Sequence, residues 1–133
     1  MAKKTATRDA DARVHELGST PQPTYQSVRA LTSSGTTSLS GTDGGGVFLS
    51  TDGDLTWTIA TIQPTSPFVE CLTASGTTLL AGTDSGVFHS TDGGLTWTAA
   101  TTQPMNLNTL SLVARGTTLL AGTIRDGVWR CPL

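Results

Sequence analysis

The residues of this sequence that could do chemistry are few, and the most suggestive are carboxylates in two similar segments. Ser50 to Trp57 reads STDGDLTW, and Ser90 to Trp97 reads STDGGLTW. Asp52 and Asp54 of the first segment could together bind a cation, because Ca²⁺ prefers carboxylate and other oxygen ligands. The second segment has a glycine in place of Asp54. A repeated cation site is therefore not expected, and we predict neither a metal ion nor a cofactor.

The other potentially reactive side chains stand alone in the sequence. Cys71 and Cys131 are too few for a four-ligand zinc site, and we expect free, partly buried thiols rather than a disulfide. His15 and His89 are isolated, and we expect His89 to be an exposed strand residue rather than a ligand. The run Gly44–Gly46 is not followed by Lys-Ser or Lys-Thr. It therefore indicates a turn and not a phosphate-binding loop.

Charge and hydropathy exclude several classes of partner. The net charge is −2, from 8 basic and 10 acidic residues that are thinly scattered. Without a basic stripe, no nucleic-acid partner is expected. No apolar run approaches the ~18–20 residues that span a bilayer, and Met1–Asp11 lacks the hydrophobic core of a signal peptide. We therefore expect a cytoplasmic protein with no membrane partner.

An internal repeat organises the elements that carry these residues. Ser34-Gly35-Thr36-Thr37 returns as Ser75–Thr78 and as Arg115–Thr118, with a period of about 40 residues. Each unit contains short apolar runs separated by turn residues, which is typical of strands. The expected strands are Ser27–Ser33, Thr37–Thr42, Gly46–Ser50 and Thr56–Thr61, then Val69–Ala74, Thr78–Thr83, Gly86–Ser90 and Thr96–Thr101, then Leu110–Ala114, Thr118–Thr123 and Val128–Cys131.

The repeat predicts an all-β fold. A four-stranded antiparallel sheet of about 40 residues has the size of a β-propeller blade. We expect an N-terminal tail at residues 1–12 and a propeller segment of about three blades at residues 13–133. The blades cover residues 27–61, 69–101 and 110–131, and the third lacks its fourth strand. Small residues on the second strands, such as Ala81, Gly82 and Ala121, would let neighbouring blades pack closely.

The two octapeptides match the Asp-box, Ser-x-Asp-x-Gly-x-Thr-Trp. The second copy fits throughout, whereas the first has Asp54 at the glycine position. The chain thus resembles the Asp-box (BNR-repeat) propellers, which include sialidases, sortilin-type receptors and photosystem assembly factors, over about Val28 to Arg130. The resemblance implies that each box forms the turn between the third and fourth strands of a blade, on the rim.

The residues of the box have structural roles on this interpretation. Carboxylates at Asp52 and Asp92 would accept hydrogen bonds from backbone N–H groups of the turn. Glycines would take positive φ without a Cβ clash, and each Trp would pack across its turn. The predicted structural residues are Ser50, Asp52, Gly53, Trp57, Ser90, Asp92, Gly93, Gly94 and Trp97.

The likeness to sialidases raises the question of glycosidase chemistry, which the residues do not support. Those enzymes need several arginines, a tyrosine nucleophile and acidic partners. Tyr25 is the only tyrosine, and Glu16 and Glu70 are the only glutamates. The arginines do not occupy equivalent positions in the repeats. We therefore predict that the protein is not an enzyme.

Three blades cannot close a ring, because propellers have about four to eight. We therefore expect a homo-oligomer, either a homodimer with six blades or a homotrimer with nine. Aligning Gln22-Pro23 with Gln63-Pro64 places residues 13–19 in the slot of a fourth strand, where they would complete a blade of the neighbouring chain. A disordered tail or a short helix are the alternatives for residues 1–20.

Repeated polar groups near the inter-blade grooves are the candidate ligand contacts. One set precedes proline in the linkers, and the other lies in the opposing loops: Gln22, Gln63 and Gln103, and Asp43, Asp84 and Asp126. The alternative is that the Gln-Pro pairs only form turns. Two functions remain open. One is a non-enzymatic, self-assembling scaffold made by repeat amplification or design, and the other is a multivalent, lectin-like or protein-binding module for a glycan or protein ligand.

Overall fold

The computed structural model describes residues 27–100 and 108–133, and all regular secondary structure in these ranges is β-strand. The predicted all-β fold is therefore confirmed. The strands are β1 (Val28–Ser34), β2 (Thr37–Thr42), β3 (Val47–Ser50), β4 (Thr58–Ile59), β5 (Val69–Ser75), β6 (Thr78–Thr83), β7 (Gly86–Ser90), β8 (Thr98–Ala99), β9 (Thr109–Arg115), β10 (Thr118–Thr123) and β11 (Val128–Pro132).

The strands form three antiparallel sheets in which sequence neighbours pair. Two sheets have four strands, in the orders β1-β2-β3-β4 and β5-β6-β7-β8, and the third has the order β9-β10-β11 within the described residues. The first hairpin of each sheet turns at Gly35, Gly76 or Gly116, whose φ values are 61°, 59° and 58°. A left-handed first turn residue suits a two-residue hairpin, which explains the repeated Gly-Thr.

The fourth strands are shorter than the sequence predicts, and the first of them ends where the chain contacts the next unit. Six-residue strands were expected at Thr56–Thr61 and Thr96–Thr101, but β4 and β8 have two residues each. After β4 the backbone turns to the next unit. Ile62 N donates to Leu95 O at 3.1 Å, and Trp97 N donates to Ile62 O at 3.0 Å. Ala60 N still donates to Val47 O of β3 at 3.1 Å, so the first unit leaves β3 after Ala60 and pairs with the second octapeptide at Ile62.

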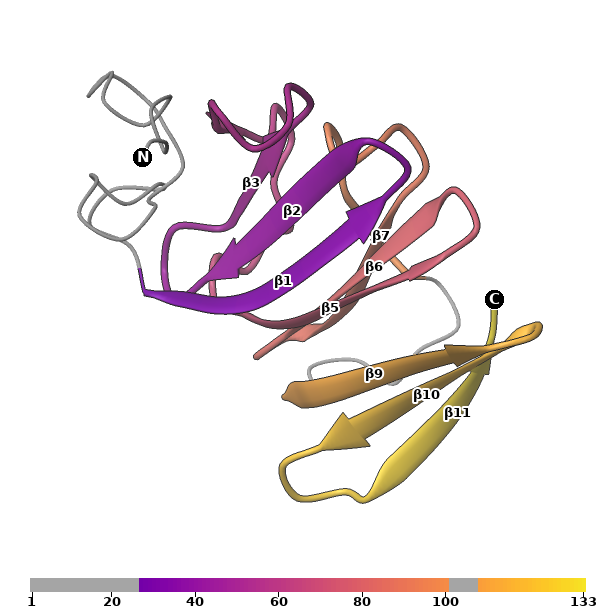
Figure 1. The fold of residues 1–133 in the computed structure, drawn as a ribbon. Coiled ribbons are helices and arrows are strands. Elements are labelled where there is room, and N and C mark those ends of the chain that lie inside the picture. Colours follow the sequence, from indigo (N-terminus) through magenta and orange to yellow (C-terminus); the bar gives the residue numbers. More distant parts are fainter. Residues whose placement is uncertain (1–26, 101–107) are drawn as a thin grey trace, which may run out of the picture.

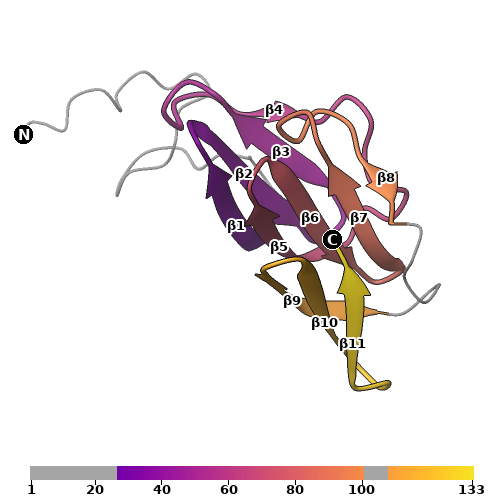
Figure 2. The same cartoon turned by 90° about the vertical axis from the view of Figure 1, so that its right-hand side faces the viewer.

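The sheets pack face to face, with the β5–β8 sheet between the other two (Figures 1 and 2). Glycines allow this close approach. A Cβ on Gly41 would lie 2.5 Å from Val69 Cγ1, and one on Gly82 would lie 2.9 Å from Thr109 Cγ2 of β9. An ion pair between Arg29 and Glu70, at 3.1 Å, adds a link from β1 to β5. The predicted close packing at Gly82 is confirmed.

Two buried clusters fill the spaces between the sheets. The first joins the β1–β4 sheet to the β5–β8 sheet, and the second joins the β5–β8 sheet to the β9–β11 sheet. The first contains Leu39, Val47, Leu49, Ala60, Val69, Leu79, Ala81, Phe88 and Trp97. The second contains Leu80, Val87, Leu119, Ala121 and Cys131.

Both cysteines are free thiols, as predicted. Cys71 is partly buried and Cys131 is buried. Burial raises the pKa of the Cys71 thiol to about 12, so that this group is protonated and unreactive at neutral pH.

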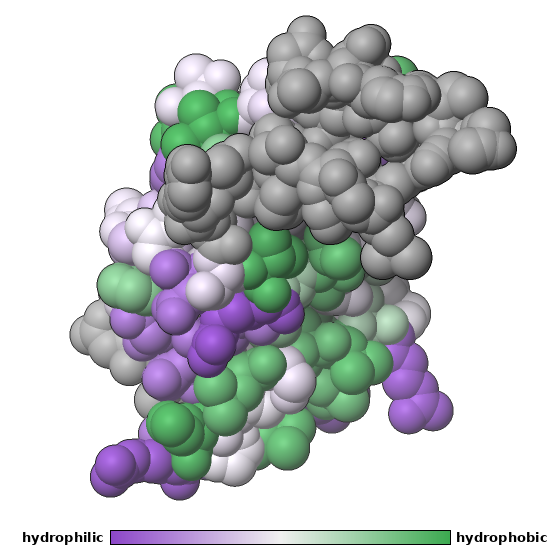
Figure 3. Space-filling view, turned by 60° about the vertical axis from the view of Figure 1, so that its left-hand side comes forward, coloured by the Kyte–Doolittle hydropathy of each residue, from purple (hydrophilic) through white to green (hydrophobic). Residues whose placement is uncertain are grey.

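The outer faces of the stack expose apolar side chains. Leu31 of β1 is 69% exposed, and Val113 of β9 and Val128 of β11 are 53% and 73% exposed. Apolar side chains gather over the part of the surface that the β9–β11 sheet forms (Figure 3). The predicted tail at residues 1–12 and the predicted strand at residues 13–19 lie outside the described residues. In residues 27–100 and 108–133 there is no helix that could cross a membrane.

Candidate functional site

The first octapeptide forms the turn between β3 and β4, and the carboxylate of Asp52 lies at its centre. Asp52 Oδ1 accepts hydrogen bonds from Ser50 Oγ at 2.9 Å, Leu55 N at 3.1 Å and Thr56 N at 3.0 Å. Asp52 Oδ2 accepts one from the Thr56 hydroxyl. Ser50 Oγ in turn accepts from Asp54 N at 3.0 Å. The serine, aspartate and threonine of the motif are thus all used to hold the turn.

The second octapeptide forms the same network between β7 and β8. Asp92 Oδ1 accepts from Ser90 Oγ at 2.8 Å and from Thr96 N at 3.0 Å, and Oδ2 accepts from the Thr96 hydroxyl. Gly94 N donates to Ser90 Oγ at 3.0 Å. Two copies with one geometry indicate that the sequence motif itself determines the turn.

These hydrogen bonds determine the protonation of the two carboxylates. The hydroxyl of Thr56, followed by its backbone N–H, lowers the pKa of Asp52 from 3.8 to about 2. Thr96 acts in the same way on Asp92, whose pKa also falls to about 2. Both groups are exposed anions at neutral pH. A carboxylate with so low a pKa is unsuited to act as a general acid or base near pH 7.

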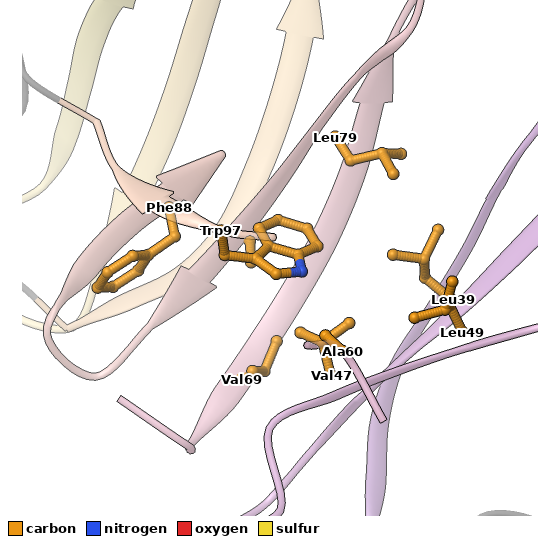
Figure 4. Close-up of a cluster of buried hydrophobic side chains, with 9 residues drawn as sticks. Leu39, Val47, Leu49, Ala60, Val69, Leu79, Phe88 and Trp97 are labelled. Carbon is orange, nitrogen blue, oxygen red and sulfur yellow. The ribbon is translucent and has the colours of Figure 1, made fainter. Parts of the chain in front are cut away.

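The two tryptophans of the motif differ in their surroundings. Trp97 is 2% exposed, and its Nε1 donates to Gly94 O at 2.8 Å. Its indole lies in the first buried cluster, among Leu39, Ala60 and Leu79 (Figure 4). Trp57 is only partly buried, and its Nε1 has no hydrogen-bond partner among the described residues. The second box packs against the first sheet, whereas the first box faces outward, which accounts for the difference.

The backbone of the two turns also differs at one position. Gly53, Gly93 and Gly94 have φ values of 78°, 77° and 94°. Asp54 has a φ of 72°, in the left-handed region that favours glycine. A Cβ at Gly94 would lie 2.6 Å from Leu39 Cδ2, so the second copy requires glycine for packing as well as for backbone conformation.

The candidate ligand contact at Gln63 is engaged by the backbone of its own sheet. Gln63 Oε1 accepts from Val47 N at 2.8 Å, and Nε2 donates to Val47 O at 3.0 Å and to Ala60 O at 3.3 Å. The approach needs Gly46, because a Cβ there would lie 2.4 Å from Gln63 Oε1. Gln63 therefore ties the linker to β3. Gln22 and Gln103 lie outside the described residues.

The three candidate aspartates lie in the connections β2–β3, β6–β7 and β10–β11, and all are exposed. Asp84 accepts a hydrogen bond from the Ser66 hydroxyl. Asp43 pairs with Phe68 as an isolated β-bridge, and Asp126 N donates to Thr123 Oγ1 at 2.9 Å. Among residues 27–100 and 108–133, no three His, Cys, Asp or Glu side chains form a group that could hold a metal ion.

A pocket between the second and third sheets is a feature that the sequence analysis missed. It has a volume of about 350 Å³, and His89 contributes to its wall. His89 is partly buried, with Nε2 3.2 Å from Thr98 Oγ1, so the expectation of an exposed side chain is wrong. The available signal was the repeat register, which places His89 where the first unit has the buried Leu49.

Comparison of the sequence with models of protein families and with curated protein sequences gives no match.

The first prediction is about how the stability of the fold changes at acid pH. Replacing Thr96 by valine removes the hydroxyl that contributes most to the low pKa of Asp92, so this pKa should rise toward 3.8. A depressed carboxylate pKa stabilises the fold above about pH 4, and this contribution is lost as the pH falls toward 2. The variant should therefore lose less stability over that interval than the parent. Carboxyl ¹³C NMR titration measures the pKa, and Thr91→Val is the matched control, expected to leave it at about 2.

The second prediction uses the difference between the two boxes. Gly94→Asp should lower the free energy of unfolding by about 1–3 kcal/mol, because its Cβ would overlap Leu39. The reciprocal change Asp54→Gly should alter it by less than about 1 kcal/mol, since relief of the left-handed strain is offset by the chain entropy of glycine. Urea unfolding measures both. Equal and opposite effects would show that backbone conformation alone distinguishes the two positions.

Proposed function

We propose that this chain is a non-enzymatic Asp-box β-propeller subunit that assembles with copies of itself into a closed ring. Three features support the proposal. The sheets are repeated antiparallel meanders. The box segments join β3 to β4 and β7 to β8 with the hydrogen bonds of a structural turn. Successive sheets pack face to face, as neighbouring blades do.

The main observation behind the proposal is that residues on the outer faces are exposed, whereas the equivalent residues of other repeats are buried between sheets. Val128 is 73% exposed, yet its counterparts one and two repeats earlier, Val87 and Val47, are 2% and 0% exposed. Leu31 is 69% exposed, whereas its counterpart Leu72 packs against the first buried cluster. The outer face of β9–β11 thus has the pattern of a face that another sheet covers.

The same comparison of equivalent residues supports one candidate for the covering face. Inside the chain, the face that carries Val47 or Val87 packs against the opposite face of the next sheet. In the β1–β4 sheet, this opposite face is not covered by another sheet among the described residues. Leu31, Ser38 and Trp57 lie on it. The third sheet of one copy would therefore pack against the first sheet of another. Such a head-to-tail contact closes a ring when the rotation permits.

A homodimer with six blades is the assembly we favour, and a homotrimer with nine is the alternative. In either ring, residues 13–19 of a neighbouring chain would pair with the edge of β11 that faces away from β10. That edge has no partner strand within the described residues. Pairing would protect it, because open strand edges are sites of aggregation.

The second candidate function is a multivalent binding module for a glycan or protein. It is favoured by the recurrence of an exposed aspartate at one connection of every repeat, as Asp43, Asp84 and Asp126. A ring would multiply these sites. A glycan array tests this function, and Asp84→Asn should reduce any signal that depends on the aspartates.

The third prediction concerns the native mass. Light scattering at micromolar concentration should give about 27 kDa for a homodimer, twice the 13.7 kDa of the chain. Val128→Asp places a charge on the face proposed to be covered and should abolish the assembly. Ile124→Asp changes a residue that is 55% exposed in the β10–β11 loop and should leave it intact. A stable monomer of the parent, or an unchanged mass for Val128→Asp, would refute the assembly.

A further inference from the structure

The pocket between the second and third sheets lies beside β11, where residues 13–19 of a neighbouring chain would pair in the proposed assembly. It has a volume of about 350 Å³ and lies within the size range of small-molecule sites in proteins. Its wall is mainly apolar, with one imidazole. Six of its lining residues are Leu80, Val87, His89, Ala100, Leu119 and Cys131.

The repeat register relates this pocket to the site that holds Trp97. In the first buried cluster, Trp97 is packed with five side chains whose counterparts one unit later all line the pocket (Figure 4). The pairs are Leu39 with Leu80, Val47 with Val87, Leu49 with His89, Ala60 with Ala100, and Leu79 with Leu119. The pocket is therefore the counterpart of an indole-binding site.

We propose that this pocket binds a small planar aromatic molecule of the indole class, one per chain. The lining residues that correspond to those around Trp97 match a fused ring in shape and hydrophobicity. Apolar cavities of this kind take up aromatic ligands when no side chain fills them. The site needs only the second and third sheets, so it does not depend on closure of the ring.

The pocket differs from the Trp97 site in that polar His89 takes the place of Leu49. The indole N–H of Trp97 donates to the Gly94 carbonyl of its own turn. A free indole has no such turn, and a ring nitrogen of His89 would accept its N–H instead. The imidazole is positioned by Thr98, whose Oγ1 lies 3.2 Å from His89 Nε2. This substitution favours an aromatic ligand with a donor group over a plain hydrocarbon.

The proposed strand at residues 13–19 would bring no aromatic side chain to the pocket. Its sequence, RVHELGS, contains no Phe, Tyr or Trp, and Glu16 occupies the register position of Trp57 and Trp97. Strand pairing with β11 would therefore bring Glu16, and no aromatic ring, to the pocket. A free ligand is the occupant that the pocket walls favour.

The test is a titration of the full chain with 5-fluoroindole, followed by ¹⁹F NMR and calorimetry. One saturable site per chain is expected, with a Kd on the order of 0.1–1 mM for so small a ligand. Octahydroindole, which is saturated and not planar, should bind at least about 10-fold more weakly. Absence of saturable 5-fluoroindole binding at about 5 mM, well above that Kd, would overturn the proposal.

Two alanines on consecutive positions provide the matched variants. Ala100 lines the pocket and Ala99 is exposed outside it. Ala100→Phe should fill the pocket and weaken 5-fluoroindole binding by at least about 10-fold, whereas Ala99→Phe should leave the Kd unchanged. Equal affinities for the two variants would show binding elsewhere on the surface and would contradict the site.

Trp97→Gly extends the test by opening the first site. The variant should bind two molecules of 5-fluoroindole per chain, and the ligand should raise its melting temperature more than that of the parent. A folded variant with unchanged stoichiometry would contradict the equivalence of the two sites. The two phenylalanine variants decide the proposal if Trp97→Gly does not fold.

Discussion

Both faces of each sheet in this chain carry apolar side chains, and both faces are buried only in the sheet that has a neighbour on either side. The β5–β8 sheet has this environment: Leu79 and Ala81 on one face are 1% and 0% exposed, and Leu80 on the other is 3% exposed. The two outer sheets have one covered face each, and Leu31 and Val128 show the consequence in their exposure. Stacking at close range, made possible by glycines on β2 and β6, is therefore the constraint from which the clusters, the outer faces and the pocket all follow.

The two octapeptides connect this stacking to local turn chemistry. Serine, aspartate and threonine fix the turn, and the turn presents Trp97 and Gly94 to the preceding sheet. Trp97 then contributes to packing between sheets while its N–H is satisfied within its own turn. The first box has the same hydrogen bonds around Asp52, yet it tolerates Asp54 in a left-handed conformation. Serine, aspartate and threonine therefore stabilise the turn in both copies, whereas glycine at position 94 and Trp97 serve the packing between sheets in the second copy.

The sequence predicted the strands well because hairpin glycines and apolar alternation are local signals. The second strands, Thr37–Thr42, Thr78–Thr83 and Thr118–Thr123, have the predicted bounds. Prediction was wrong where contacts are made between units. β4 is short because Ile62 pairs with the next octapeptide, and His89 is partly buried because it lines the space between the second and third sheets. Similarly, no periodicity shows that Gln63 bonds to the backbone of Val47.

Equivalent positions at the internal interfaces and at the proposed interface between chains carry residues of different polarity. Leu49 and Leu79 belong to the same buried cluster between the first two sheets. At the next interface the corresponding residues are His89 and Leu119, and between copies they would be Arg130 and Ser38. Polarity thus increases at the faces that a free subunit exposes. Interfaces between separately folded units are generally more polar than a domain core, because each face must remain soluble until its partner arrives. In the proposed ring, the hydroxyl of Ser38 would lie where the guanidinium of Arg130 could donate to it, so Arg130 would have a hydrogen-bond partner although the interface would lose apolar contact.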